Sequence, residues 1–115
     1  MSTDTIFHKI IRREIPANIV YEDEQVIAFR DINPVAKTHI VVVPKVTISS
    51  LREVTDKNKD VLGHLLLVTS KLARDEGLDE SGYRVVFNAG ESGGQTVFQL
   101  HAHLIGGRPF SWPPG

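Results

Sequence analysis

The chain has 115 residues, of which 41% are hydrophobic and 23% charged, with a formal net charge of −1 and no cysteine. This length fits a single domain, residues 1–115, with 108–115 as a C-terminal tail. The balanced charge argues against a nucleic acid polymer or a membrane surface as partner, and the lack of cysteine excludes disulfides and thiolate chemistry. Residues 1–5 lack the basic start and apolar run of a signal peptide, so we expect a cytoplasmic protein.

The first half of the chain predicts one short helix and three strands. Apolar residues at helical spacing over 6–11 predict a helix that ends near 15–16, with Thr3, Asp4 and Thr5 as possible N-caps. Apolar runs at 19–21 and 26–29 predict a hairpin, and residues 31–34 have the composition of a turn. Residues 38–43 form a β-branched run that Pro44 stops, which is typical of a strand.

The second half predicts a long helix and two more strands. A helical turn is expected over 49–54, and the apolar stripe over 55–76 predicts a long amphipathic helix that Gly77 ends. Residues 83–87 and 97–105 read as strands joined by the glycine-rich loop 88–94. Short connections favour antiparallel pairing, so we predict an α+β domain with a five-stranded antiparallel sheet.

Strand 97–105 carries the side chains most suited to chemistry. Because side chains alternate along a strand, Gln99, His101 and His103 share one face, while Phe98, Leu100, Ala102 and Leu104 face the core. Two imidazoles about 7 Å apart can supply a nucleophile and an acid near neutral pH. The glycine loop before them, with the Thr96 hydroxyl, can supply donors for an anion.

Other interpretations of the histidines remain open. His101 and His103 could bind zinc with His39 as the third ligand, although no carboxylate shares their face and glutamine is a poor zinc ligand. His8 and His64 lie on predicted helices and read as ordinary, partly exposed residues. Trp112, followed by two prolines, is costly to leave in water, so we expect it to dock on the domain or on a second subunit.

At these residues the chain resembles the histidine-triad (HIT) superfamily, and within it the nucleotide-binding branch of purine nucleoside phosphoramidases. The motif of the superfamily, His-x-His-x-His-x-x, reads here Gln99-Leu100-His101-Ala102-His103-Leu104-Ile105, with glutamine in place of the first histidine. Residues 6–11, 28–32, 38–39, 43–45, 93–97 and 106–115 also match, and the Trp-Pro-Pro-Gly ending at 112–115 is specific to that branch.

The resemblance implies a ten-stranded, two-fold homodimer that hydrolyses the P–N bond of nucleoside 5′-phosphoramidates without metal or other cofactor. His101 would be the nucleophile, carrying a covalent nucleotidyl group, and a backbone carbonyl would fix its tautomer. His103 would bind the phosphate and help to protonate the leaving amine. Gln99 could bridge to His39 by hydrogen bonds and serve as a support that does not titrate.

The resemblance also implies the binding residues for purine nucleoside monophosphates and phosphoramidates. Asn88 and the backbone of Gly94, Gln95 and Thr96 would hold the phosphoryl oxygens, and Asp31 would bind the ribose hydroxyls. Phe7, Ile10, Phe29 and Ile32 would form the purine pocket, and Trp112 would reach the partner's active site. Three alternatives stay open: a nucleotide-binding adaptor with little turnover, a zinc-binding protein, and a scaffolding dimer with a vestigial pocket.

Overall fold

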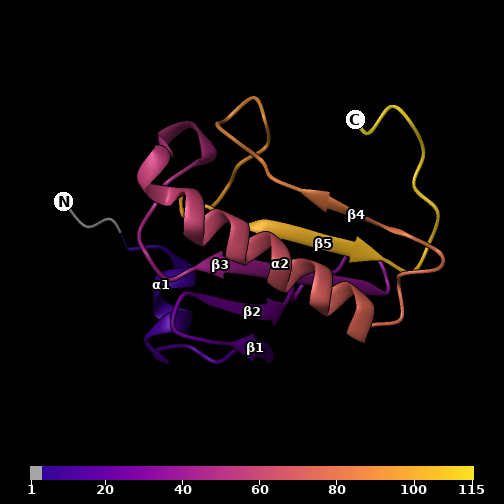
Figure 1. The fold of residues 1–115 in the computed structure, drawn as a ribbon, viewed down its shortest axis with the longest axis horizontal. Helices are drawn as coiled ribbons and strands as arrows, with labels where there is room; N and C mark the ends of the chain where they lie inside the picture. Colours follow the sequence, from indigo (N-terminus) through magenta and orange to yellow (C-terminus); the bar gives the residue numbers. More distant parts are fainter. Residues whose placement is uncertain (1–3) are drawn as a thin grey trace.

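Residues 4–115 are described by a computed structural model, so the N-cap predicted at Thr3 lies outside the described residues. The elements follow the order α1 (Ile6–Ile11), β1 (Ile19–Glu22), β2 (Val26–Arg30), β3 (Thr38–Pro44), the 3₁₀ turns η1 (Leu51–Glu53) and η2 (Asp56–Asn58), α2 (Lys59–Asp75), β4 (Tyr83–Val86) and β5 (Ala102–Gly106) (Figure 1). The predicted α+β fold is confirmed, because the five strands form one sheet.

The sheet has the order β1-β2-β3-β5-β4, and every neighbouring pair is antiparallel. In Figure 1 helix α2 crosses one face of this sheet. Strands β3 and β5 lie at its centre, with Val41 opposite His103 and His39 opposite Ile105. His39 and His103 are therefore offset by two residues on adjacent strands, so their side chains are diagonal neighbours on one face of the sheet.

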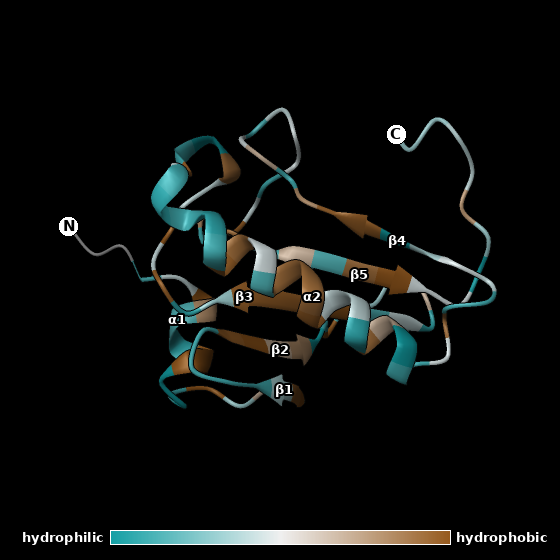
Figure 2. Ribbon diagram, in the orientation of Figure 1, coloured by the Kyte–Doolittle hydropathy of each residue, from teal (hydrophilic) through white to brown (hydrophobic). Residues whose placement is uncertain are grey.

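Side-chain alternation divides the core into two layers. The layer under α2 includes Val26, Ala28, Ile40, Val42, Leu65, Val68, Leu72, Ala102 and Leu104. The layer on the other face consists of Phe7, Ile10, Ile27, Phe29, Val41 and Val43, so it packs against α1. In Figure 2 the strands of the sheet are largely brown, the colour of hydrophobic residues, where these buried side chains lie. Because His39 and His103 alternate with the α2-facing residues, they stand on the α1 side.

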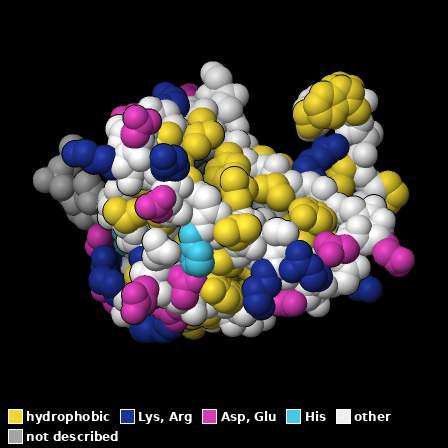
Figure 3. All heavy atoms as spheres, in the orientation of Figure 1, with side chains coloured by type: hydrophobic (Ala, Val, Ile, Leu, Met, Phe, Trp, Pro, Cys, Tyr) yellow, Lys and Arg dark blue, Asp and Glu magenta, His cyan; other side chains and the backbone are white. Residues whose placement is uncertain are grey.

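Helix α2 is shorter than the predicted helix over 55–76. Thr55 caps the separate 3₁₀ turn η2, and the α-helix begins only at Lys59. Leu65, Val68 and Leu72 are buried as the stripe predicts, and Gly77 ends the helix at φ 75°. Leu66 on the same helix is half exposed, and Figure 3 shows hydrophobic side chains over this face of the molecule.

Of the two histidines predicted to be partly exposed on helices, His8 is buried and His64 is partly exposed as expected. Helix α1 ends at Ile11 rather than near 15–16, and Thr5 caps it by accepting from the His8 N–H. His8 Nδ1 accepts from the Thr5 N–H at 3.0 Å, so His8 closes a capping box and is buried rather than partly exposed. His64 is partly exposed, as expected, but its Nε2 lies 2.6 Å from Asp23 Oδ2.

The strand predicted over 97–105 begins only at Ala102. The preceding residues are held by contacts outside the ladder, because the Leu100 N–H donates to the Ile48 carbonyl at 2.6 Å. Phe98 was predicted in the core, but it is 45% exposed since this irregular segment does not keep strand alternation. Leu100, Ala102 and Leu104 are buried as predicted.

Among residues 4–115, no helix combines the length and apolar character needed to cross a membrane.

Candidate active site

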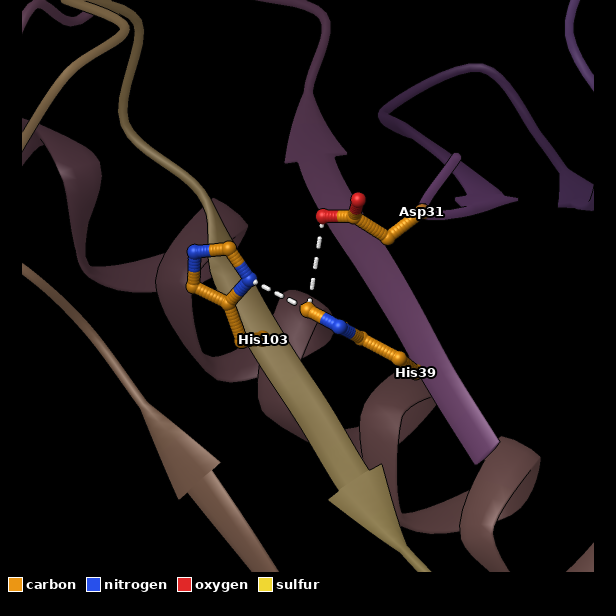
Figure 4. A group of neighbouring side chains, drawn as sticks. All are labelled: Asp31, His39 and His103. Atoms are coloured by element: carbon orange, nitrogen blue, oxygen red, sulfur yellow. Dashed lines mark hydrogen bonds and ion pairs between the residues drawn. The ribbon is translucent and has the colours of Figure 1, made fainter. Parts of the chain in front are cut away.

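Three polar side chains from different segments converge on the α1 side of the sheet (Figure 4). His39 comes from β3, His103 from β5, and Asp31 follows the end of β2. His39 Nε2 lies 2.9 Å from His103 Nδ1 and 3.4 Å from Asp31 Oδ2. The histidine strand itself carries no carboxylate, as expected, and Asp31 comes instead from the residue after β2, where its N–H donates to the His39 carbonyl at 2.9 Å.

His101 lies beside this group with a fixed orientation. Its ring centroid is 4.9 Å from that of His103 and 4.8 Å from that of Phe7, which meets it edge-on. Its Nδ1 lies 2.7 Å from the backbone carbonyl oxygen of Gln99. Because a carbonyl can only accept, Nδ1 carries the proton and Nε2 keeps a free lone pair in the neutral ring. The backbone contact therefore leaves a nucleophilic nitrogen on His101.

A hydrogen bond between His39 and His103 gives His103 the tautomer opposite to that of His101. The Val35 N–H donates to His39 Nδ1 at 3.2 Å, so the proton of neutral His39 sits on Nε2. That proton can be donated to His103 Nδ1, which places the proton of His103 on its own Nε2. One neighbouring imidazole thus offers a lone pair and the other an N–H, as an attacking base and an acid require.

All three imidazoles favour the neutral form at neutral pH. Burial lowers the pKa of His101 and of His39 below the ordinary value of 6.5. Burial, reinforced by His101 and His39, lowers the pKa of His103 to about 4. The Gln99 carbonyl and Asp31 oppose these shifts without reversing them. The tautomers argued above therefore apply near pH 7.

Several donors of the glycine-rich loop form hydrogen bonds within the loop itself. The Gly94 N–H donates to the Glu91 carbonyl and the Gln95 N–H to the Gly90 carbonyl, both at 3.0 Å. Two of the three backbone donors expected for a phosphate are thus engaged inside the loop. The Asn88 amide likewise donates to the Gly93 carbonyl at 2.8 Å.

Thr96 follows the loop and is the expected phosphate contact that stays available. It is exposed, and among residues 4–115 neither its N–H nor its hydroxyl has a protein partner. The Gln95 side chain, by contrast, is buried and fully used, because it accepts from Gly90 and donates to the Ser49 and Val97 carbonyls. Gln95 braces the loop, and Thr96 faces outward from it.

The apolar residues expected around a purine line one pocket of about 120 Å³ together with Asp31. The expected members are Phe7, Ile10, Phe29 and Ile32. Phe7 and Phe29 meet edge-to-face at 5.5 Å, and Phe7 also contacts His101, so the pocket adjoins the imidazoles. An apolar slot beside polar, fixed side chains is typical of a small-molecule site.

Two predicted contacts do not form. Gln99 does not bridge to His39, because its amide bonds to Pro44, Val46 and Ile48 instead. Trp112 is 83% exposed, so it does not dock on its own domain, and the tail of Figure 1 projects from the sheet. The sequence also gave no signal for Val35, whose role rests on its backbone N–H alone.

Comparison with known proteins places this geometry among related chains. The HIT domain family matches residues 12–110. A purine nucleoside phosphoramidase of Escherichia coli K12 is 49% identical over 109 residues, covering 95% of this chain and 92% of the relative. A 14 kDa zinc-binding protein of Zea mays is 54% identical, covering 96% of this chain and 88% of the relative. The crystal structure of a HIT family hydrolase from Legionella pneumophila superposes with a TM-score of 0.95 at 47% identity, covering 97% and 100% of the two chains.

Proposed function

Because this chain belongs to the HIT domain family, we propose that it is a hydrolase that cleaves the P–N bond of purine nucleoside 5′-phosphoramidates. The observation that carries this proposal is the pair of neighbouring imidazoles, His101 and His103, held in opposite tautomers. The named activity of the E. coli relative supports the choice of substrate class.

The reaction proceeds in two displacements at phosphorus. His101 Nε2 attacks the α-phosphorus, an N–P bond forms, and the P–N bond to the leaving amine breaks. The proton on His103 Nε2 goes to the departing nitrogen, so the amine leaves neutral. Water then attacks phosphorus and gives a proton back to His103 Nε2, the bond to His101 breaks, and the nucleoside monophosphate is released. His39 supports His103 by donating to its Nδ1.

Substrate contacts follow from the groups left free around the imidazoles. Thr96 supplies a hydroxyl and a backbone N–H for the phosphoryl oxygens, and the turn at 90–95 positions it. The purine enters the pocket lined by Phe7 and Phe29, and Asp31 at its edge binds the ribose hydroxyls. An apolar slot with few polar groups accepts both adenine and guanine. No step in this scheme uses a metal ion or a cofactor.

We also propose that two chains pair across the β4 edge into a ten-stranded homodimer. Strand β4 is the last of the sheet and has a free side, and a strand edge of this kind pairs readily with another strand. Trp112 is 83% exposed and Leu67 on α2 is 71% exposed, which a second subunit would cover. In that dimer Trp112 approaches the partner's active site. Analytical ultracentrifugation of the full chain tests it, and a monomer at micromolar concentration rejects it.

Turnover of a fluorogenic adenosine 5′-phosphoramidate tests the activity. We expect release of the fluorescent amine by the wild-type chain and loss of turnover in His101→Ala, with AMP binding retained in calorimetry. AMP binding without turnover in the wild-type chain would favour the nucleotide-binding adaptor. Failure to bind any purine nucleotide would favour the scaffolding dimer.

Zinc binding is the second candidate, because Asp31, His39 and His103 offer ligand atoms that all lie within 4.8 Å of one another. The maize relative's name points to the same function. The donor set fits poorly, however, because His39 Nδ1 accepts from the Val35 N–H. Ligation through Nε2 would move the proton of neutral His39 to Nδ1, where it would face that N–H. We expect substoichiometric zinc by elemental analysis and turnover unaffected by EDTA.

A further inference from the structure

The polar atoms of the Gln99 side chain are all hydrogen-bonded. It is fully buried at 0% exposure, and its amide makes three hydrogen bonds to the backbone. Its Oε1 accepts from the Ile48 N–H at 3.1 Å, and its Nε2 donates to the carbonyls of Pro44 at 2.8 Å and Val46 at 3.0 Å. Both amide hydrogens are therefore bonded to the end of β3 and the segment that follows it.

The backbone of the same residue holds His101. The Gln99 carbonyl oxygen accepts the Nδ1 proton of His101 at 2.7 Å. The next residue is anchored too, because the Leu100 N–H donates to the Ile48 carbonyl at 2.6 Å. The side chain and its neighbour thus fix the peptide whose carbonyl selects the His101 tautomer.

We infer that Gln99 is a positioning residue, whose amide clamp on residues 44–48 aims its carbonyl at His101 and so presents Nε2 to phosphorus. This inference rests on the proposed function for its catalytic consequence, but the clamp and the tautomer can be tested without turnover. Gln99 itself contacts no reacting atom. It therefore acts through His101 and not on the substrate.

The chemistry of the clamp explains why glutamine suits this position. A neutral imidazole has one donor and one acceptor, so histidine could satisfy only two of the three backbone groups. Methionine has nearly the same length but donates nothing, and leaves all three groups without a strong partner. Ionised glutamate would face the Pro44 and Val46 carbonyls with acceptors only. The expected order of function is Gln, then His, then Met, then Glu.

Gln95 provides a matched control elsewhere in the same segment. It is also buried and its amide also makes three bonds to the backbone, but no imidazole bonds to its carbonyl. Gln95→Met removes the same number of bonds, one of them to the glycine-rich loop at Gly90, and should act on phosphate binding, raising KM. Gln99→Met should act on the nucleophile and lower kcat.

The experiment combines kinetics with ¹⁵N NMR of the imidazoles. In Gln99→Met we expect kcat to fall about 10- to 100-fold with KM changed less than about threefold, and His101 to lose its single Nδ1–H tautomer. Gln99→His should recover most of kcat, and Gln95→Met should keep the Nδ1–H tautomer. A folded Gln99→Met chain that retains this tautomer overturns the inference, as does a kcat equal to that of the wild type.

The two readouts separate the inference from the proposed function. If the wild-type chain shows no turnover but Gln99→Met scrambles the His101 tautomer, the clamp stands and the proposed activity fails. If Gln99→Met does not fold, Gln99→His decides, since it retains two of the three bonds. A Gln99→His chain with wild-type kcat and a mixed His101 tautomer would show that the tautomer has no bearing on rate, and would overturn the inference.

Discussion

Gly93 offers the sharpest test of the glycine-rich loop as the anion site. A Cβ added there would lie 2.4 Å from the Ala89 carbonyl oxygen, whereas real Cβ contacts essentially never fall below 3.0 Å. The obstacle is backbone and not a flexible side chain, so Gly93→Ala must open the turn that leads to Thr96. Overpacking of this kind costs about 1–3 kcal/mol of folding stability.

Gly93→Ala should weaken AMP binding by more than a general loss of folding stability would. Displacing Thr96 removes a hydrogen bond to a charged phosphate, worth about 1.5–3 kcal/mol. The AMP dissociation constant in Gly93→Ala should therefore rise about 10- to 100-fold, measured by titration calorimetry.

Gly77→Ala is the matched control for that change. Gly77 has φ 75° and open space around its Cα, so alanine there is strained by about 1–2 kcal/mol without touching the site. We expect it to lower the unfolding free energy in urea by a similar amount and to leave AMP affinity intact. If Gly93→Ala binds AMP as tightly as Gly77→Ala does, the loop does not hold the phosphate.

Three further predictions concern the pocket, the protonation states and the core. Ile32→Ala should raise KM for an adenosine phosphoramidate about threefold, since Ile32 lies at the pocket's exposed edge. Leu51→Ala, outside that pocket, should leave KM unchanged. Equal KM values for the two variants would show that Ile32 is not part of the site. Protonation of His101 removes its lone pair, and burial holds its pKa below 6.5, so kcat/KM should fall as pH is lowered with a midpoint below 6.5. A midpoint above 6.5 contradicts the argument. Leu65→Ala, at 0% exposure under the sheet, should lower the unfolding free energy by about 3–5 kcal/mol in urea, and a loss under 1 kcal/mol would refute its place in the core.

Local patterns were enough to predict the fold and the face of the histidines. The alternation around His101 and His103 and the stripe of α2 depend on neighbours in sequence, so they could be read directly. The end of α2 at Gly77 was readable for the same reason. These elements account for the sheet and for the layer in which the imidazoles lie.

Contacts between distant segments could not be read in the same way. The Gln99 amide bonds to backbone groups that precede it by 51 to 55 positions in the sequence. Nothing in the sequence around Gln99 selects these groups over His39. Asp31 meets His39 because it continues the pairing of β2 with β3, with its N–H donating to the His39 carbonyl at 2.9 Å. The tautomers depend on the Val35 N–H and the Gln99 carbonyl, backbone groups that every residue type except proline possesses, so no side-chain pattern can reveal them.

The central claim is that His101 Nε2 becomes bonded to phosphorus during turnover. Rapid acid quench with adenosine phosphoramidate, followed by intact-mass and peptide analysis, tests it directly. We predict a population heavier by one adenylyl group, with the added mass on His101 and absent from His101→Ala. Turnover with no covalent species at any quench time, or an adenylyl group mapped to His103, would contradict the account.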